Sequence, residues 1–321
     1  MKKIKNKKTL IFFIIICTLT IIVGWGIKEK LENFFYAWLI ARKPFILVEI
    51  FPDSSEINER LALNSQLQSK AALSVLVDLE GRERFFFKRQ ENEKFPIASL
   101  TKLMTALIVL DNYKLSDKIK ITEAVVKQEG EAGQLKPDEI LSVKDLLYIT
   151  LIESSNDAAY ALILPMGEEK FVDLMNLKAQ NLGLNNTYFT NSTGLDSSDS
   201  LGPSNYSTAK ELVKLTKYLI FNKPEMFEIL SKKEYNLYLE NNVFHHRLVN
   251  TNKLLEESAP PVGGWQTKIM GGKTGYTEKA EDCLVLVLKC KDNYLVNVIL
   301  GAQNKFEEMK KILNYVENKC N

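Results

Sequence analysis

Histidine is nearly absent from this chain. Only two of its 321 residues are histidines, His245 and His246, and they are adjacent. A Ser-His-Asp triad needs a histidine held between a serine and a carboxylate, and the G-x-S-x-G turn that presents such a serine in many hydrolases does not occur either. A hydrolase built from this sequence therefore needs a base other than histidine.

Cysteine is also scarce. Of the four cysteines, three lie beyond the apolar N-terminal region, at Cys283, Cys290 and Cys320, an odd number at a spacing that fits no metal site. We therefore expect neither a disulfide framework nor a bound metal, and we predict that all three are buried or incidental thiols. No other cofactor is indicated by the sequence.

A strong excess of charge of one sign is missing as well. The formal net charge is +2, and residues 1–8 hold five of the 42 basic residues, which leaves 37 basic against 40 acidic residues in the remainder. This balance gives no basic footprint for nucleic acid, so we expect no nucleic-acid partner. With 45% hydrophobic and 26% charged residues, the composition is that of a globular protein.

What the chain does have is one long apolar run near its start. Residues 9–27 carry no charge and are rich in Ile, Leu, Phe and Val, and as a helix they reach roughly 28 Å, enough to cross a bilayer. The lysines before the run should stay in the cytoplasm, which places the rest of the chain outside. If the run were a cleaved signal peptide, Gly24-Trp25-Gly26 would be the one candidate cleavage site. If it were a lipoprotein signal, Cys17 would need a small residue before it, but isoleucines precede it. An uncleaved signal anchor in the lipid bilayer is the preferred interpretation.

The chain then divides into four predicted segments. We expect a cytoplasmic basic tail over 1–8, a transmembrane signal anchor over 9–27, a juxtamembrane stalk or linker over 28–69, and one folded domain over 70–321. Residues 33–50 are rich in aromatics and suit an interfacial stalk, although the first helix of the folded domain is an alternative.

Hydrophobic periodicity predicts strands at both ends of the folded domain and helices between them. The predicted strands are 72–78, 82–88, 283–289 and 294–300, and the predicted helices are 99–110, 143–152, 157–166, 168–182, 209–221 and 305–317. This order favours an α/β (α+β) domain in which both ends of the chain complete a single antiparallel sheet flanked by helices.

The first chemical candidate is Ser99-Leu100-Thr101-Lys102. Residues three apart on a helix share a face, so the Lys102 amine should lie beside the Ser99 hydroxyl. A lysine is a base only in its neutral form, which burial and a nearby cation favour. Taken alone, S-x-x-K is common, and a helix cap followed by a surface lysine is the simpler interpretation.

The second candidate is Ser154-Ser155-Asn156, in a break between two predicted helices. The Ser154 hydroxyl could relay a proton to a leaving amine, and the Asn156 amide could orient a carbonyl and the lysine. An ordinary N-cap turn explains these residue types equally well, because Ser, Asn and Asp favour such positions.

The third candidate is the segment from Gly271 to Thr277, which contains Lys273-Thr274-Gly275-Tyr276. At the edge of a strand, a lysine and a threonine can hold a carboxylate, and a glycine lets a ligand backbone approach closely. A phosphate-binding loop is excluded because Thr267 occupies the position where that motif requires its first glycine. In addition, a strand rather than a helix is predicted to follow.

Together the three motifs are far more specific than each alone. In this order and in these elements, the chain resembles the penicillin-recognising serine acyl-transferases, most closely the low-molecular-mass D,D-carboxypeptidases, which have the β-lactamase/transpeptidase-like fold. The resemblance extends over residues 70–317. The chain departs from the resembling sequences at two positions, because Asp138 and Glu281 occur where those sequences usually have glycine. We therefore expect altered turns at both positions.

The resemblance implies acyl transfer on peptidoglycan stem peptides that end in D-Ala-D-Ala, with inhibition by β-lactams. Ser99 would be the nucleophile and Lys102 its base, Ser154 and Lys273 would move the leaving-group proton, and Asn156 would orient Lys102. Thr274 and Gly275 would bind the terminal carboxylate and backbone, and the oxyanion would lie between the Ser99 and Tyr276 N–H groups. Lys305 is a further candidate for the carboxylate. A D,D-endopeptidase, a β-lactamase and a catalytically idle wall-binding scaffold remain alternatives.

The N-terminal anchor can be tested directly. If residues 9–27 are an uncleaved anchor, mass spectrometry of the mature protein from membranes should recover peptides from residues 1–8. A mature N-terminus that begins after residue 23 would show instead that the run is a cleaved signal.

Overall fold

The computed structural model describes residues 54–130, 133–197, 202, 204–256, 268–316 and 319. The predicted tail, anchor and aromatic stalk lie outside these residues, and no helix within them is long and apolar enough to span a bilayer. The chain divides into two compact units, 1–58 and 59–321. The features described below belong to the second unit.

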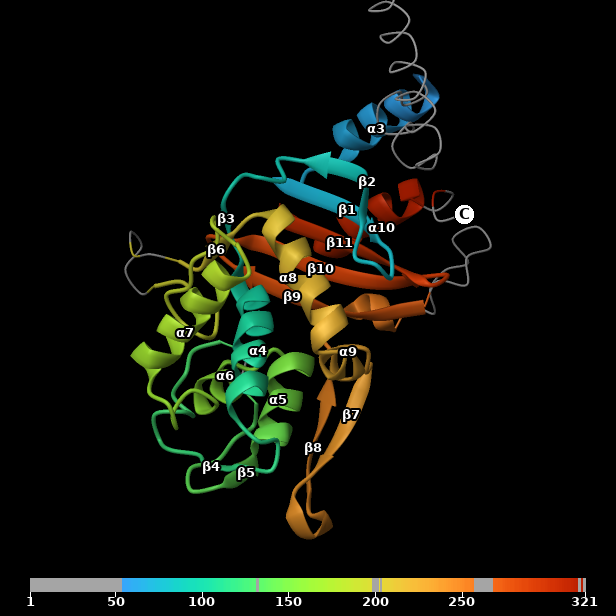
Figure 1. Cartoon of the computed structure of the whole chain (residues 1–321). Helices are drawn as coiled ribbons and strands as arrows, with labels where there is room; N and C mark the ends of the chain where they lie inside the picture. Colours follow the sequence, from blue (N-terminus) through green and yellow to red (C-terminus); the bar gives the residue numbers. More distant parts are fainter. Residues whose placement is uncertain are drawn as a thin grey trace, which may run out of the picture. The chain divides into compact units, whose positions relative to one another are not determined.

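A five-stranded antiparallel sheet forms the centre of this unit (Figure 1). Its order is β2-β1-β11-β10-β9, so strands from the two ends of the chain lie side by side. The strands are β1 (Ala71–Val77), β2 (Glu83–Arg89), β9 (Lys268–Thr277), β10 (Glu281–Cys290) and β11 (Asn293–Ala302). The predicted antiparallel sheet is confirmed, with the four predicted strands within two residues of their observed bounds.

Both faces of the sheet are buried, which explains the nearly continuous apolar sequence of its inner strands. Successive side chains of a strand point to opposite faces. In β10, Cys283, Val285 and Val287 enter the larger core, whereas Leu284 and Leu286 enter the second core on the other face. The sheet is thus a rigid platform held from both sides.

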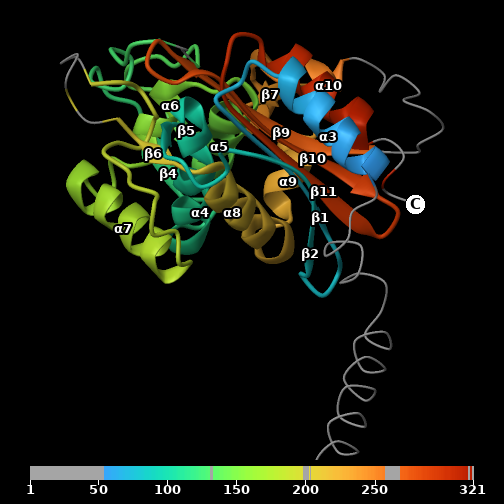
Figure 2. The same ribbon diagram turned by 90° about the horizontal axis from the view of Figure 1, so that it is seen from above.

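Helices cover the two faces unequally (Figure 2). The larger core is covered by α4 (Lys102–Asn112), α5 (Val143–Ile152), α6 (Asn156–Ala161), α7 (Glu168–Asn181), α8 (Ala209–Asn222) and α9 (Glu225–Leu230), and α10 (Lys305–Val316) packs on the opposite face. Of these, α8 contacts β1 and β11, and α9 contacts β9. The helices predicted at 143–152, 168–182, 209–221 and 305–317 are all present.

The structure differs from the predicted linker over residues 28–69. Helix α3 (Ser54–Gln66) occupies its last part, and Leu63 and Leu67 are only 5% and 4% exposed in the core under α10. The compact unit begins at Glu59 rather than near residue 70. The polar composition of this helix hid the two leucines that attach it.

Several other local features were not predicted. Residues 98–101 form the 3-10 turn η1 (Ala98–Thr101) before α4, and α6 ends at Ala161 rather than continuing to 166. Short strands β3 (Phe95–Pro96) and β6 (Tyr206–Ser207) pair with each other, as do β4 (Lys118–Lys120) and β5 (Ile140–Ser142). The hairpin of β7 (Glu234–Tyr238) and β8 (Phe244–Val249) was missed entirely.

The cysteine prediction is half right. Cys283 is a free thiol in the larger core, and burial raises its pKa to about 12, so it is chemically inert at neutral pH. Cys290 is disulfide-bonded, so the prediction of a free thiol is wrong there. The odd number of cysteines beyond the apolar run concealed this pairing.

The two departures from the resembling sequences keep the backbone shape of glycine. Asp138 has φ 67° and Glu281 has φ 55°, both in the left-handed region that glycine adopts most easily. These two non-glycine residues therefore bear the steric cost of a backbone conformation that glycine adopts easily.

Candidate active site

Ser99 and Lys102 are brought together at the junction of η1 and α4. The Lys102 Nζ lies 2.9 Å from the Ser99 Oγ. Lys102 is fully buried, whereas Ser99 is partly exposed. The sequence placed Ser99 at the start of an α-helix, but it lies in the 3-10 turn that precedes α4. The pair therefore couples a reachable hydroxyl to an amine shielded from water.

Lys102 also meets two oxygen acceptors from distant parts of the chain. Its Nζ donates to the Asn156 Oδ1 at 2.7 Å and to the Thr193 backbone carbonyl at 2.7 Å. These two acceptors can take the N–H groups of a neutral amine and leave its lone pair for the Ser99 hydroxyl. Thr193 was not predicted, because a backbone carbonyl leaves no residue-type signal in a sequence.

The turn before α6 resolves the two interpretations of Ser154-Ser155-Asn156. Ser155 is the N-cap, and its Oγ accepts the Ala158 N–H at 3.0 Å. Ser154 and Asn156 on either side are both buried and hydrogen-bonded to the two lysines. The capping role and the polar contacts thus coexist within one turn.

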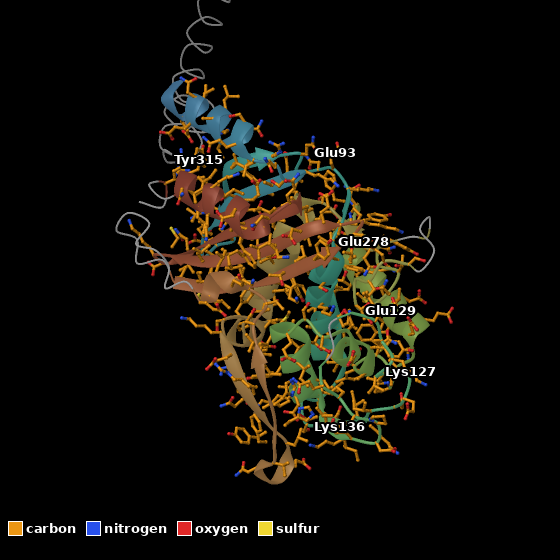
Figure 3. All side chains as sticks on the ribbon, turned by 180° about the vertical axis from the view of Figure 1, so that it is seen from behind. Glu93, Lys127, Glu129, Lys136, Glu278 and Tyr315 are labelled. Atoms are coloured by element: carbon orange, nitrogen blue, oxygen red, sulfur yellow. The ribbon has the colours of Figure 1, made fainter. Side chains whose placement is uncertain are left out.

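Asn156 is fixed in orientation by the segment between β4 and β5. Its Nδ2 donates to the Glu129 carbonyl at 2.8 Å, which directs Oδ1 toward Lys102. Figure 3 labels Lys127, Glu129 and Lys136 along this segment, on the side of the molecule opposite to the view of Figure 1. A Cβ at Gly130 would lie 2.7 Å from the Asn156 Nδ2, so only glycine lets the segment pass this closely.

A second serine–lysine pair lies on the edge strand β9. The Lys273 Nζ donates to the Ser154 Oγ at 2.7 Å and to the Thr274 carbonyl at 2.9 Å, and Lys273 is 1% exposed. Ser154 has φ 66°, a left-handed conformation that costs energy for a serine. Such strain persists only where the surroundings impose it, and the Lys273 contact is one of those constraints.

Glycines allow β9 to lie directly against the Ser99 turn. A Cβ at Gly275 would lie 3.1 Å from the Ser99 backbone nitrogen, and one at Gly194 would lie 2.0 Å from the Ala98 carbonyl oxygen. Tyr276, which follows in β9, is 65% exposed. The backbones of the Ser99 turn and of β9 therefore lie close together.

Two threonine hydroxyls meet beside this strand. The Thr274 Oγ1 lies 2.6 Å from the Thr251 Oγ1. Thr251 is held in place because its backbone N–H donates to the Ile152 carbonyl at 3.1 Å. Sequence reasoning missed Thr251, since a single threonine between β8 and β9 carries no pattern.

Lys305, the further candidate for a carboxylate, is engaged by the sheet. Its Nζ lies 2.5 Å from the Asp282 Oδ1 and 3.3 Å from the Gly275 carbonyl oxygen. Its side chain is 12% exposed. In this structure Lys305 thus supports the Gly275 backbone of β9 and bonds to a carboxylate of the protein itself.

This geometry defines a class of chemistry. A partly exposed serine beside a buried lysine, with a second lysine–serine pair across from it, is the arrangement of a serine hydrolase whose base is lysine. Within the described ranges no group of three His, Cys, Asp or Glu side chains is placed to hold a metal ion.

The comparisons with known proteins agree with this class. The family model for the D-alanyl-D-alanine carboxypeptidases of peptidase family S11 matches residues 60–304. The chain is 30% identical over 282 residues to D-alanyl-D-alanine carboxypeptidase DacF of Bacillus subtilis, covering 85% of this chain and 68% of that protein. It is 36% identical over 241 residues to the carboxypeptidase DacC of Escherichia coli, covering 70% of this chain and 56% of that protein. The chain belongs to the S11 family.

Solved structures and a further relative extend the comparison. A D-alanyl-D-alanine carboxypeptidase from Mycobacterium tuberculosis superposes with a TM-score of 0.68 at 25% identity, covering 78% of this chain and 91% of that one. Penicillin-binding protein D2 of Listeria monocytogenes in its ampicillin-bound form superposes with a TM-score of 0.62 at 27% identity. The match covers 78% of this chain and 96% of that one. The D-alanyl-D-alanine endopeptidase of Escherichia coli is 31% identical over 75% of this chain and 74% of its own length. The fold is transpeptidase-like, and the enzyme is a serine peptidase of the carboxypeptidase and endopeptidase kind.

A buried carboxyl group lies next to the site. Asp157 is 3% exposed, and its Oδ2 accepts the Gly133 N–H at 3.2 Å, whereas its Oδ1 has no hydrogen-bond partner among the described residues. Burial raises the pKa of this carboxyl above its usual value, although backbone N–H groups partly oppose the shift. The folded protein therefore binds a proton at Asp157 more tightly than the unfolded chain does.

We predict that Asp157→Asn stabilises the protein at neutral pH. At low pH the carboxyl is neutral in both the folded and the unfolded state, so ionisation costs the wild type nothing. As pH rises from about 4, the unfolded state ionises first and the wild type loses stability until the folded-state pKa is passed. The difference in Tm between the variant and the wild type should thus grow from pH 4 to pH 7. A difference that is constant with pH would contradict the shift.

Proposed function

We propose that this protein is a membrane-anchored, serine-type D-alanyl-D-alanine carboxypeptidase that acts on peptidoglycan outside the cytoplasmic membrane and is inhibited by penicillins. The observation that carries the proposal is the contact of the Ser99 hydroxyl with the buried Lys102 amine, opposite the Lys273–Ser154 pair. Membership of the S11 family supports the substrate class, and the predicted N-terminal anchor supports the location.

In the proposed acylation, the Ser99 Oγ attacks the carbonyl carbon of the penultimate D-alanine while its proton passes to Lys102. The negative charge that develops on the carbonyl oxygen is stabilised by the Ser99 and Tyr276 backbone N–H groups. Asn156 and the Thr193 carbonyl keep the lone pair of Lys102 directed at Ser99.

The tetrahedral intermediate then breaks its C–N bond and expels the terminal D-alanine. The leaving nitrogen takes a proton from the Ser154 hydroxyl, which is replenished by Lys273, its partner at 2.7 Å. Water finally hydrolyses the ester on Ser99 and releases the shortened peptide. A β-lactam would acylate Ser99 by the same first step.

A D,D-endopeptidase is the second candidate, because a relative of that name is similar over three quarters of this chain. It would use the same residues on a cross-linked peptide. The two activities differ in what occupies the leaving-group side of the site, so both substrates need to be assayed in parallel.

The carboxypeptidase should release free D-alanine from a pentapeptide that ends in D-Ala-D-Ala, and Ser99→Ala should abolish this release because the acyl-enzyme cannot form. A fluorescent penicillin should label the wild type on Ser99 and leave Ser99→Ala unlabelled in mass spectrometry. Cleavage of only a cross-linked muropeptide would favour the endopeptidase. If no substrate is cleaved and Ser99→Ala binds the peptide as well as the wild type, the protein is a scaffold.

The threonine pair provides a sharper test of specificity for a free C-terminal carboxylate. We expect both hydroxyls, which now bond to each other, to rotate and donate to the two carboxylate oxygens. A hydrogen bond to a charged group is worth about 1.5–3 kcal/mol, so Thr251→Val should lower kcat/KM roughly ten- to hundredfold.

The matched control is Thr251→Ser, which keeps the hydroxyl and should stay near the wild-type value. A peptide whose C-terminus is amidated should show a much smaller difference between the Val and Ser variants. Equal kcat/KM for Thr251→Val and the wild type on the carboxylate substrate would exclude Thr251 from the site.

A further inference from the structure

Two buried asparagines flank Thr251, the threonine whose hydroxyl meets that of Thr274. They lie in the short segment between β8 and the 3-10 turn η3 (Lys253–Leu255). Asn250 and Asn252 are 5% and 0% exposed, whereas Thr251 between them is partly exposed. Burying an amide costs free energy unless the amide is hydrogen-bonded. The partners of the two asparagines therefore show what holds Thr251 in place.

Asn250 uses both ends of its side-chain amide. Its Nδ2 donates to the Lys232 carbonyl at 2.9 Å and to the Leu230 carbonyl at 3.3 Å. Its Oδ1 accepts the Asn252 N–H at 2.9 Å. One side chain thus ties the end of α9 to the backbone on the far side of Thr251.

The end of α9 explains why an asparagine suits this position. The last carbonyls of a helix have no partner within the helix, and α9 ends at Leu230 with Ser231 as its C-cap residue. An asparagine side chain offers two N–H donors and one acceptor, whereas a serine offers one donor and an ionised aspartate offers none. Asn250 uses all three groups, two of them for the carbonyls at the end of α9.

The end of α9 is also fixed relative to the strand that carries Thr274. Helix α9 contacts the edge strand β9 (Figure 1). A Cβ at Gly271 of β9 would lie 2.8 Å from the Leu230 Cβ, so strand and helix end are in direct contact there. A residue held by the end of α9 is therefore held in register with β9.

Further contacts fix the Thr251 segment along the chain. The Thr251 N–H donates to the carbonyl of Ile152, the last residue of α5, at 3.1 Å. Asn252 is the N-cap residue of η3, and its Oδ1 accepts the Leu254 N–H at 3.3 Å. The segment is thus restrained by α5, α9 and η3, and Asn250 makes the link to α9.

We propose that Asn250 is a positioning residue for recognition of the substrate's C-terminal carboxylate. By tying the end of α9 to the segment around Thr251, it keeps the Thr251 hydroxyl beside that of Thr274. Hydrogen bonds weaken steeply when their geometry is poor, so a small displacement of Thr251 weakens its bond to the carboxylate. This inference rests on the proposed function, in which these two hydroxyls bind the carboxylate.

The test compares kcat/KM for two pentapeptides that end in D-Ala-D-Ala, one with a free C-terminal carboxylate and one with an amide. Asn250→Ala should lower kcat/KM for the free carboxylate roughly three- to thirtyfold, the range expected for a residue that acts through its neighbours. The amidated peptide should lose much less. Adding Asn250→Ala to Thr251→Val should cost little more than Thr251→Val alone, because the hydroxyl that Asn250 positions is then absent.

Asn250→Asp provides a variant of the same shape. It keeps the acceptor for the Asn252 N–H but cannot donate to the two carbonyls, so it should reproduce the loss seen with alanine. The matched control is Asn222→Ala, which removes an exposed asparagine whose Nδ2 donates to the Tyr218 carbonyl of α8 at 2.9 Å. This control should leave both substrates unaffected, and melting curves should show that each variant is folded.

Three outcomes would overturn the inference. One is a wild-type kcat/KM for the free carboxylate in both Asn250 variants. Another is an equal loss on the two peptides, which would indicate a general structural role. The third is full additivity of Asn250→Ala and Thr251→Val, which would mean that Asn250 does not act through Thr251.

Amide hydrogen exchange separates this inference from the proposed function. In Asn250→Ala the Thr251 amide should exchange faster than in the wild type, while the amides of β10 keep their protection. Unchanged exchange at Thr251 would contradict the positioning role even in an active enzyme. If the wild type releases no D-alanine, the proposed function fails, and faster exchange at Thr251 would still show that Asn250 holds this segment.

Discussion

The burial of Lys102 is the constraint on which the rest of the structure depends. An amine with no exposed surface is costly unless its hydrogen bonds are satisfied, because the desolvation of a charged or polar group must be offset inside the protein. Its hydrogen-bond partners come from three separate segments: the Ser99 turn, the start of α6 and the Thr193 carbonyl. Moving any one of these segments leaves the amine poorly paired. The packing of the helices on the sheet and the geometry of the site therefore depend on each other.

The same logic explains where strain is found. Ala98, which precedes Ser99, and Ser154, the serine of the second pair, both have positive φ, at 45° and 66°. Non-glycine residues keep such conformations only where the surrounding structure imposes them. Close neighbours surround Ala98: a Cβ at Gly275 of the edge strand would lie 3.1 Å from the Ala98 Cβ, and one at Gly194, in the loop after α7, would lie 2.0 Å from the Ala98 carbonyl oxygen.

The sequence predicted the features that repeat or that depend on residue type. Strands with both faces buried have long apolar runs, and the amphipathic helices α7, α8 and α10 have a clear period, so both were found. The three motifs were recognised because serine, lysine and asparagine are residue types suited to acyl-transfer chemistry. Thr193 contributes a carbonyl and Thr251 a hydroxyl, and the apolar contacts of the α3 segment come from Leu63 and Leu67. Features of this kind depend on tertiary placement, and no local pattern records them.

The missed β7–β8 hairpin shows why such omissions concentrate near the site. Strand prediction relies on alternation, and the bulge at His245 breaks alternation at the position where both histidines must turn to one face. A regular strand would have been easier to recognise, but it would have directed His245 away from His246, whose Nε2 lies 3.0 Å from a Glu153 carboxylate oxygen. A catalytic turn with a strained serine needs support from several directions, and support from an irregular strand leaves little trace in the local sequence pattern. Irregularity in the supporting elements is therefore expected wherever a fold holds a strained catalytic group.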